Sequence, residues 1–318
     1  MEERYPKSLA EFEDQFGSAE QCWQYLFELR WPDGFVCPRC HGGRYWRSKG
    51  NLLVCAGCQF QASVTAGTVF QDTRKPLSTW FRAMWWVTSQ KNGASALGLQ
   101  RVLGLGSYRT AWAWLHKLRR AMVRPGRDRL HGLVQVDETY WGAIEEGHQG
   151  REPGKKALIA VAVEKDGRRC GRIRMRRVRD ASAGSLHPFI QDSVDPGSTV
   201  ETDGWRGYSG LASLGYVHHP GNQGRLGLPG VEADLLPYAH RVISLLKRWL
   251  LGTHQGAISA EHLDYYLDEF AFRFNRRTSQ YRGKLFYRLV QQAVQVAPAP
   301  YQSLIRHVRG RPGRKPKP

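Results

Sequence analysis

The sequence predicts a mixed α/β protein, in which a cysteine-rich module and a helical segment precede a mixed sheet with flanking helices. Three observations predict this class. Four of the six cysteines form two close pairs within residues 37–58. Residues 76–124 carry helical periodicity, and beyond residue 130 the apolar residues alternate or run continuously, as they do in strands. The 318 residues are therefore expected to divide into four segments, 1–70, 71–130, 131–285 and 286–318.

Residues 18–29 are expected to form the first helix, because Ser18 and Gln21 have the spacing of a capping box. Residues 76–90 begin with proline, which suits a first helical turn, and continue with helical periodicity.

A helix, a glycine turn and a longer helix are expected over residues 94–122. Leu103–Gly106 forms the turn, and Ser107 can cap the helix that follows. This order outlines a helix-turn-helix, which places its second helix in the major groove of DNA. The alternative is a solvated basic helix on a helical bundle. In the first interpretation, the basic side chains of the second helix contact DNA, namely Arg109, Lys117, Arg119 and Arg120.

Five strands are expected after residue 130. Residues 133–137 alternate, whereas residues 157–163 form a continuous apolar run that is typical of a buried central strand. Residues 204–214 are expected to be a helix or a turn. The remaining expected strands are 170–179, 199–203 and 216–219, and the remaining expected helices are 182–192, 237–251 and 259–273.

The charge balance indicates a polyanionic partner. The chain has 47 Lys and Arg against 28 Asp and Glu, a formal charge of +19, and so basic a protein attracts phosphates in a salt-dependent way. An ordinary metabolic enzyme is therefore not the first expectation. No apolar run reaches the roughly 18 residues of a membrane span, and residues 1–10 lack the apolar core of a signal peptide. We expect a cytoplasmic protein.

Two further basic features have less specific interpretations. Alternation over residues 170–179 puts Arg172, Arg174 and Arg176 on one face, which either meets nucleic acid or is solvated. The last nine residues, 310–318, are basic and of low complexity, as in a disordered tail that adds phosphate affinity.

The paired cysteines predict a structural zinc site. Cys37 and Cys40 form one C-x2-C pair, Cys55 and Cys58 form another, and fourteen residues separate the pairs. Two such turns supply the four thiolates of a closed tetrahedral Zn²⁺ site. A rubredoxin-type iron site is the alternative.

Two aspartates end strands that are expected to be neighbours. Asp137 ends the first strand of the sheet and Asp203 ends the fourth. A mixed sheet with this order of elements brings these two strands side by side, so that both carboxylates meet at one edge. Oxygen ligands of this kind hold Mg²⁺ or Mn²⁺, and two such ions can activate water or a 3′-hydroxyl at a phosphodiester. A helix-capping or turn role is the alternative for either residue.

Three stretches carry a resemblance to a known family. The segments DETYWG, TDGWRGY and HRVISLLKRWLLGTHQG, the last continued by HLDYYLDEFAFRFNRR, resemble insertion-sequence transposases of the DDE class. The closer match is to the branch with an N-terminal zinc ribbon. The likeness runs from Trp31 to the helix after Phe286 and implies a ribonuclease-H-like catalytic domain, preceded by a DNA-binding zinc ribbon and a helix-turn-helix.

The resemblance also implies a third catalytic position on a helix, with a lysine seven residues later. Asp137 and Asp203 take the first two positions, and Lys247 fits the lysine, which puts His240 in the third. The family more often has Glu or Asn there. A neutral imidazole can bind a metal or act as a base and tolerates Mn²⁺ better than Mg²⁺.

Other interpretations of the third position stay open. His240 can be an ordinary exposed histidine at a helix start, with Glu232 or Asp234 of the preceding glycine-rich loop in its place. Glu138 is a poor ligand because it points to the opposite side of its strand from Asp137. Trp205 and Tyr208 either pack the segment onto the sheet or stack on a flipped base.

Together these observations favour a metal-dependent DNA transposase that cuts at the terminal inverted repeats and joins the freed 3′-hydroxyl to target DNA. We expect a structural Zn²⁺, two catalytic Mg²⁺ or Mn²⁺ ions, phosphate contacts from Lys247 and Arg248, and no membrane partner. Since two ends must be held together, we expect a homodimer or larger assembly on double-stranded DNA at the nucleoid. The rivals are a decayed or domesticated transposase that only binds DNA, and a ribonuclease-H-like nuclease or resolvase that cuts without joining.

Overall fold

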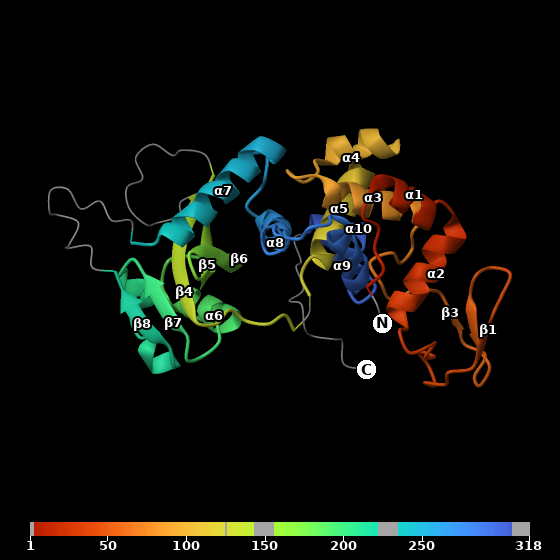
Figure 1. Ribbon diagram of the computed structural model, residues 1–318, viewed down its shortest axis with the longest axis horizontal. Coiled ribbons are helices and arrows are strands. Elements are labelled where there is room, and N and C mark those ends of the chain that lie inside the picture. The colour runs from red at the N-terminus through yellow and green to blue at the C-terminus, as the bar shows by residue number, and fades with distance from the viewer. Residues whose placement is uncertain (1–2, 125, 143–155, 222–234, 307–318) are drawn as a thin grey trace. The chain divides into compact units, whose positions relative to one another are not determined.

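The computed structural model describes residues 3–124, 126–142, 156–221 and 235–306. These residues form two compact units, one made of residues 1–125 and 278–318 and the other of residues 126–277 (Figure 1). Each unit is described by itself. None of the described helices is long and apolar enough to cross a membrane.

The first unit combines a small three-stranded sheet with a helical bundle. Its sheet is antiparallel with the order β1-β2-β3. The expected capping box of Ser18 and Gln21 is present at the start of the second helix. The elements are α1 (Leu9–Phe16), α2 (Ala19–Arg30), β1 (Tyr45–Arg47), β2 (Leu53–Cys55), β3 (Gln61–Ala62), α3 (Leu77–Ser89), α4 (Ala96–Leu103), α5 (Tyr108–Ala121), α9 (Gly283–Ala293) and α10 (Tyr301–Ile305).

The C-terminal helix α9 completes the core of the first unit. Phe286 lies at the centre of an aromatic cluster, with its ring centroid 5.5 Å from that of Phe12, 5.3 Å from Phe16 and 5.7 Å from Phe81. Gly283 begins the helix where the backbone of Pro6 passes so close that a β-carbon would overlap its carbonyl oxygen. The first unit is therefore assembled from both ends of the chain.

The second unit is built on a five-stranded mixed sheet with the order β6-β5-β4-β7-β8. The β4–β5 and β5–β6 pairs are antiparallel, and the β4–β7 and β7–β8 pairs are parallel. The predicted adjacency of the first and fourth strands is confirmed by the β4–β7 pair. The elements are β4 (Leu133–Trp141), β5 (Ala157–Asp166), β6 (Arg169–Val178), α6 (Ala183–Ser193), β7 (Thr199–Thr202), η1 (Arg206–Tyr208), η2 (Ala212–Leu214), β8 (Val217–Pro220), α7 (Pro237–His254) and α8 (Leu263–Phe274).

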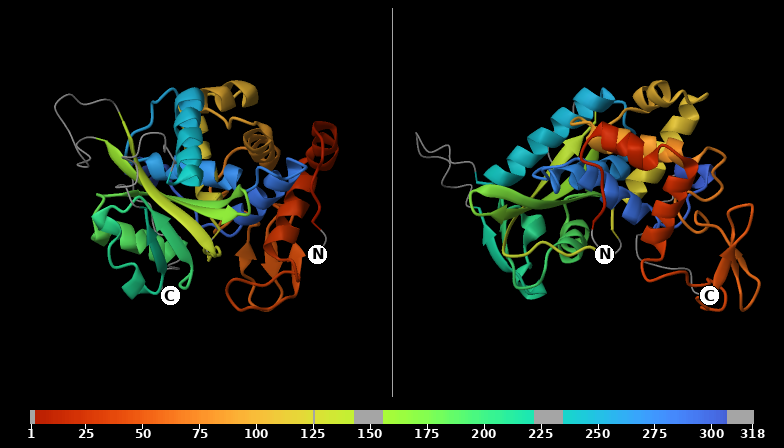
Figure 2. Two further views of the ribbon diagram at one scale, coloured as in Figure 1. Left: turned by 60° about the vertical axis from the view of Figure 1, so that its left-hand side comes forward. Right: turned by 45° about the vertical axis from the view of Figure 1, so that its right-hand side comes forward.

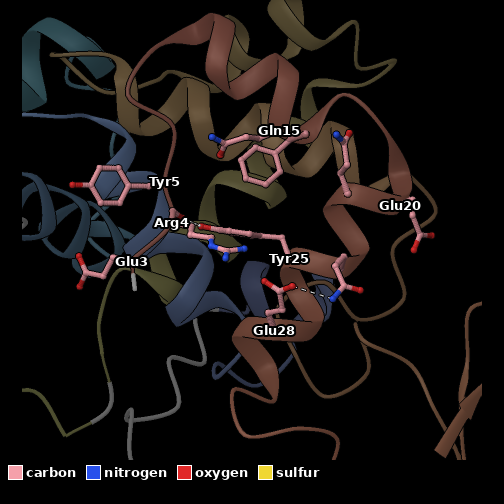
Figure 3. A pocket seen from close by; sticks show the side chains of 10 residues that line it. Glu3, Arg4, Tyr5, Gln15, Glu20, Tyr25 and Glu28 are labelled. Atoms are coloured by element: carbon pink, nitrogen blue, oxygen red, sulfur yellow. Dashed lines mark hydrogen bonds between the residues drawn. The ribbon is translucent and has the colours of Figure 1, made fainter. Parts of the chain in front are cut away.

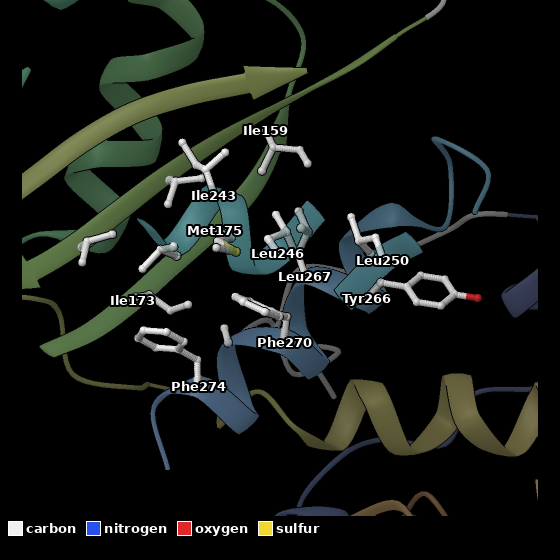
Figure 4. Close-up of a cluster of buried hydrophobic side chains, with 14 of the residues drawn as sticks. Ile159, Ile173, Met175, Ile243, Leu246, Leu250, Tyr266, Leu267, Phe270 and Phe274 are labelled. Carbon is white, nitrogen blue, oxygen red and sulfur yellow. The ribbon is translucent and has the colours of Figure 1, made fainter. Parts of the chain in front are cut away.

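Each face of this sheet has its own apolar layer. On one face, Ile159, Val161 and Ile173 pack against α7 and α8, as Figure 4 shows for the side chains around Ile243 and Phe270. On the other face, Val134 and Val136 pack against α6 and the segment around Tyr208. Figures 1 and 2 show α7 and α6 on opposite sides of the strands. The alternation of β4 therefore fixes which of its side chains lie under α7.

The arginines of β6 are held by partners within the unit. Arg172 forms a salt bridge with the buried Glu164, Arg174 is 5% exposed and donates to the Ile173 carbonyl, and Arg176 pairs with Asp192. The row is therefore not simply solvated, because each arginine has a partner within the unit, although Arg176 and Asp192 pair at the surface.

The Glu164 carboxylate has strong donors around it. Arg172 donates through Nε at 2.9 Å and Nη2 at 2.8 Å, and the His131 N–H donates at 3.1 Å. Burial alone would raise the pKa of Glu164, but the hydrogen bonds outweigh it and lower the pKa to about 2. A carboxylate with a lowered pKa stabilises the fold at every pH above its unfolded value, and this contribution is lost as the pH falls towards 2.

Glu164→Gln should therefore lower the free energy of unfolding by about 2 kcal/mol at pH 7, because the charged acceptor is lost. The difference from the wild type should shrink as the pH falls from about 4.5 to about 2. Denaturant unfolding at several pH values measures this. Asp166→Asn, at the exposed end of the same strand, is the control. A difference that is the same at pH 7 and pH 2 would contradict this role for the Glu164 charge.

Candidate catalytic site and zinc module

Asp137 and Asp203 come from adjacent parallel strands. The register pairs Val134 with Val200 and Gln135 with Glu201. Two residues further along, this register puts Asp137 opposite Asp203, which directly follows the end of β7. The expectation that Asp137 ends its strand is wrong, because β4 continues to Trp141 through its pairing with β5, whereas β7 ends at Thr202. Asp137 therefore lies in the middle of β4, beside the point where β7 stops. The two predicted carboxylates therefore come from neighbouring positions beside the C-terminal end of β7.

His240 lies beside Asp137. Its Nε2 is 3.3 Å from Asp137 Oδ2, and the His240 side chain is 53% exposed while that of Asp137 is 13% exposed. The other oxygen, Oδ1, accepts a hydrogen bond from the Glu138 N–H at 2.9 Å. The histidine sits in the first turn of α7, which packs over β4 and β5. The structure thus brings together two of the three residues expected at the catalytic positions.

A tight turn holds Asp203. Its Oδ1 accepts a hydrogen bond from the Trp205 N–H at 2.9 Å, and the Trp205 indole donates to the Ala181 carbonyl at 2.7 Å. Gly204, between them, has φ +79°, and a β-carbon there would lie 2.5 Å from the Gly221 carbonyl oxygen. The backbone after Asp203 therefore requires glycine, which accounts for the Asp-Gly-Trp sequence.

A histidine on the neighbouring strand supports this turn. His218 Nε2 lies 3.0 Å from the Thr202 hydroxyl, which also accepts a hydrogen bond from the Gly204 N–H at 3.3 Å. Burial lowers the pKa of His218, with a smaller contribution from His219. No sequence pattern indicates this contact, because β8 has to be placed beside β7 before His218 can be related to Thr202.

Glu138 and Tyr208 lie on the opposite face of the sheet from Asp137. Glu138 pairs with Ala160, on the α6 side, and accepts a hydrogen bond from the Tyr208 hydroxyl. Burial, and then the Glu138 carboxylate, raise the pKa of Tyr208 well above its usual value. Tyr208 is fully buried, so its packing role is confirmed and base stacking is wrong for it. Trp205 is partly buried against the same layer.

The donor set fits a divalent ion, although its members do not all converge. Carboxylate oxygens and an imidazole nitrogen suit Mn²⁺ and, less well, Mg²⁺. Among the described residues, the cysteines alone form a group of three or more ligand atoms within 4.8 Å of one another, so Asp203 does not close on Asp137 and His240 to that spacing. The other proposed ligands, Glu232 and Asp234, lie outside the described residues, as does the tail 310–318.

Lys247 lies on the same helix as His240, seven residues later, and both are exposed. Arg248 is exposed as well. Seven residues correspond to almost two turns, so Lys247 and His240 share one face of α7. With a rise of 1.5 Å per residue, Lys247 lies about 10 Å along the helix axis from His240.

The four cysteines of the first unit fit a structural zinc ion. All four sulfur atoms lie within 4.8 Å of one another, with Cys37 and Cys58 3.6 Å apart and Cys40 and Cys55 3.5 Å apart. Tetrahedral Zn–S bonds of about 2.3 Å require sulfur separations of about 3.8 Å. Hydrogen bonding from the Cys58 backbone lowers the pKa of Cys55 to about 6, which favours the thiolate. The donors and their spacing match the site predicted from the sequence.

The helix, glycine turn and helix expected at residues 94–122 are present as α4 and α5. Gly104 ends α4 with φ +59°, in the left-handed conformation. Arg109 is exposed at the start of α5, whereas Lys117 is half-buried and burial lowers its pKa. Arg120 is also half-buried. The expectation that Arg119 contacts DNA is wrong, because its side chain is buried, at 2% exposed.

A pocket of about 710 Å³ in the first unit is a separate feature (Figure 3). Its acidic side chains already have partners, since Glu3 pairs with Lys284 and Arg288, and Glu20 pairs with Arg47. The Tyr25 hydroxyl donates to the Arg4 carbonyl. The polar side chains that line the pocket are therefore bonded to other residues of the first unit, and nothing in their arrangement indicates a ligand.

Comparisons with known proteins agree with the geometry. The ISXO2-like transposase domain matches residues 129–275, and the transposase zinc-ribbon domain matches residues 17–61. A protein described as an uncharacterized protein in transposable element ISH50, from Halobacterium salinarum, is 26% identical over 292 residues, which cover 85% of this chain and 94% of that protein.

The first match spans β4 to α8, with Asp137, Asp203 and His240, and the second includes all four zinc-site cysteines. The fold and the cysteine module are those that the resemblance implied. The chain belongs to the insertion-sequence transposases of the DDE superfamily, in the branch that carries an N-terminal zinc ribbon.

Proposed function

We propose that this chain is a catalytically competent DNA transposase whose active site consists of Asp137, Asp203 and His240. The observation that carries the proposal is the placement of the two aspartates at neighbouring positions, Asp137 in the middle of β4 and Asp203 directly after β7, with His240 Nε2 3.3 Å from Asp137. Neighbouring carboxylates with an imidazole are a donor set for divalent ions. When bound, Mg²⁺ or Mn²⁺ would supply Lewis-acid stabilisation of the attacking and leaving oxygens.

The side chains have distinct tasks in this reaction. Asp137 and Asp203 provide the negative charge that holds cations beside a phosphodiester, and each is oriented by a backbone N–H, of Glu138 and Trp205 respectively. His240 adds a neutral nitrogen ligand or accepts a proton from the attacking water. Lys247, on the same face of α7, binds a phosphate of the element end as a compact positive charge.

The chemistry needs no external energy source. Water attacks the phosphorus at the element boundary, the P–O3′ bond breaks, and the element is left with a free 3′-hydroxyl. That hydroxyl then attacks a target phosphorus and forms a new P–O3′ bond. The displaced target 3′-oxygen takes up the proton. One phosphodiester replaces another in the joining step.

DNA recognition is proposed for the first unit, together with Lys247 and Arg248. The zinc ribbon and residues 76–124 would bind the terminal inverted repeats, with Arg109 at the exposed start of α5, where recognition helices contact base edges. Lys117 and Arg120, half-buried farther along α5, would reach backbone phosphates. Because two element ends must be joined together, the working form would be a dimer or larger on DNA at the nucleoid.

The second candidate function is that of a transposase-derived protein that binds DNA but has no catalytic activity. The observation that favours it is the imidazole of His240 in place of a carboxylate, together with the absence of a three-ligand cluster around Asp137 and Asp203 among the described residues. The experiment that follows separates the two candidates.

Asp203→Ala should abolish metal-dependent nicking of labelled duplexes that contain the DNA flanking the gene. Loss of a charged ligand removes several kcal/mol of transition-state stabilisation, so the rate should fall by about 1000-fold or more. Asp166→Asn, exposed at the end of β5, should nick at the wild-type rate. Tight binding of these duplexes without nicking by the wild type, in either Mg²⁺ or Mn²⁺, would establish the non-catalytic candidate instead.

His240→Ala should slow nicking by about 100-fold, while His240→Glu should keep activity and shift the preference from Mn²⁺ towards Mg²⁺, which favours oxygen ligands. The ratio of the rates in the two metals measures the shift. Ser244→Ala, exposed one turn later on α7, is the control. Wild-type rates for His240→Ala in both metals would make His240 an ordinary exposed histidine.

Arg109→Ala should weaken binding to the element end and reduce the slope of log K against log salt by about one, as expected for one lost phosphate contact. If Arg109 contacts a base edge, the variant should also lose about 1–3 kcal/mol of discrimination against the wrong base at one position of the DNA site. Filter binding over a salt series measures both effects. Arg168→Ala removes an equal charge from the β5–β6 turn, and an equal effect from that variant would disprove a specific contact.

A further inference from the structure

Gln135 is a buried polar residue under α7. It lies on β4 two residues before Asp137, on the same face of the sheet, and is 3% exposed. Its Oε1 accepts hydrogen bonds from two backbone N–H groups of α7, that of Tyr238 at 2.9 Å and that of Ala239 at 3.2 Å. Its Nε2 donates to Glu201 Oε2 at 3.0 Å.

These bonds supply the N-terminal cap that the helix itself lacks. The first N–H groups of a helix have no partner within the helix and usually bond to a capping side chain. Here the cap position is Leu236, which has no acceptor in its side chain, and Pro237 follows it. Gln135 therefore caps α7 from the sheet, and its loss would leave two N–H groups unbonded in a buried region, which is costly.

Glu201 determines which way the Gln135 amide points. A carboxylate only accepts hydrogen bonds, so it must face the NH2 group of the amide. The carbonyl oxygen is then directed towards α7. Gln135 and Glu201 are partners in the β4–β7 register, as Asp137 and Asp203 are when the register is extended by two residues. A polar pair thus lies directly behind the acidic pair and bonds to the helix that carries the third residue.

We propose that Gln135 is a positioning residue, which sets the axial position of α7 and so holds His240 against Asp137, with Glu201 orienting its amide. His240 immediately follows Ala239, whose N–H is bonded to Gln135. A shift of α7 by one residue would move His240 by about 1.5 Å along the helix and rotate it by about 100°. This inference rests on the proposed function for its effect on metal binding, but the cap itself does not depend on that function.

The first test removes the acceptor. Gln135→Leu should weaken Mn²⁺ binding to the full chain by about 10- to 100-fold. Calorimetry measures this, with Asp203→Ala showing how much Mn²⁺ binds outside the proposed site. It should also remove the hydrogen-exchange protection of the Tyr238 and Ala239 amides. Val163→Ala, buried in the same layer under α7, is a control for lost stability and should leave both measurements unchanged at temperatures where it is folded.

The second test exchanges the two side chains. Gln135→Glu should impair Mn²⁺ binding, because two carboxylates would face each other at about 3 Å. Glu201→Gln should have a smaller effect than Gln135→Glu, since an amide oxygen can still accept from Gln135 although the amide no longer enforces its orientation. The double variant Gln135→Glu, Glu201→Gln should recover binding, because the carboxylate introduced on β4 can accept from α7 and from the new amide on β7.

The outcomes separate this inference from the proposed function. Tyr238 and Ala239 amides that exchange as fast in the wild type as in Gln135→Leu would overturn the cap, whatever the metal result. If the cap is seen but Gln135→Leu binds Mn²⁺ no more weakly than Val163→Ala, or the double variant fails to recover, the positioning role is wrong. A wild type that neither binds Mn²⁺ nor nicks DNA would overturn the proposed function and, with it, the positioning role towards a metal site.

Discussion

The parallel pairing of β4 with β7 is the constraint on which the second unit depends. It sets Asp137 and Asp203 opposite each other when the observed register is extended by two residues, with Asp137 in the middle of β4 and Asp203 directly after β7. A slip of one residue in β4 would move Asp137 to the α6 face and Glu138 to the α7 face, because side chains alternate along a strand. The apolar layers prevent such a slip, since it would remove Val134 and Val136 from the layer under α6 and put polar side chains of β4 in their place.

The position of α7 needs two different kinds of interaction. Apolar contacts of Val242, Leu246 and Leu250 hold the helix onto the sheet, but apolar burial has no preferred direction and tolerates small shifts. Hydrogen bonds are directional, and the first turn of α7 donates two of them to Gln135, which is why we propose that they set the position of the helix along its axis. A residue in the first turn of such a helix is held more closely than one farther along it, which agrees with the roles proposed for His240 as a metal ligand and for Lys247 as a phosphate contact.

Much of this organisation follows from local sequence patterns. Alternation and the continuous apolar run locate β4 and β5, cysteine spacing locates the zinc module, and strand order pairs β4 with β7. Contacts between segments that are distant in the sequence have no such local pattern. Gln135 has the pattern of a solvent-facing residue of an alternating strand until α7 is placed over it. Arg119 has the pattern of a surface residue until α5 is seen to contact α4, α9 and α10, and no local pattern places α9 in the same core as Phe12.

An imidazole at the third position, in place of a carboxylate, changes the charge balance at the proposed active site. Asp137 and Asp203 contribute two negative charges, whereas a site with a third carboxylate contributes three, so His240 weakens the attraction for cations. The same change reduces repulsion of the scissile phosphate, because phosphates and carboxylates repel each other over a Debye length of about 8 Å at physiological salt. Lys247, on the face of α7 shared with His240, adds to that second effect. At the proposed site, an imidazole in place of a carboxylate would therefore exchange affinity for the metal against affinity for DNA. The axial fixation of α7 that we propose for Gln135 would offset part of the loss by keeping the nitrogen ligand in place.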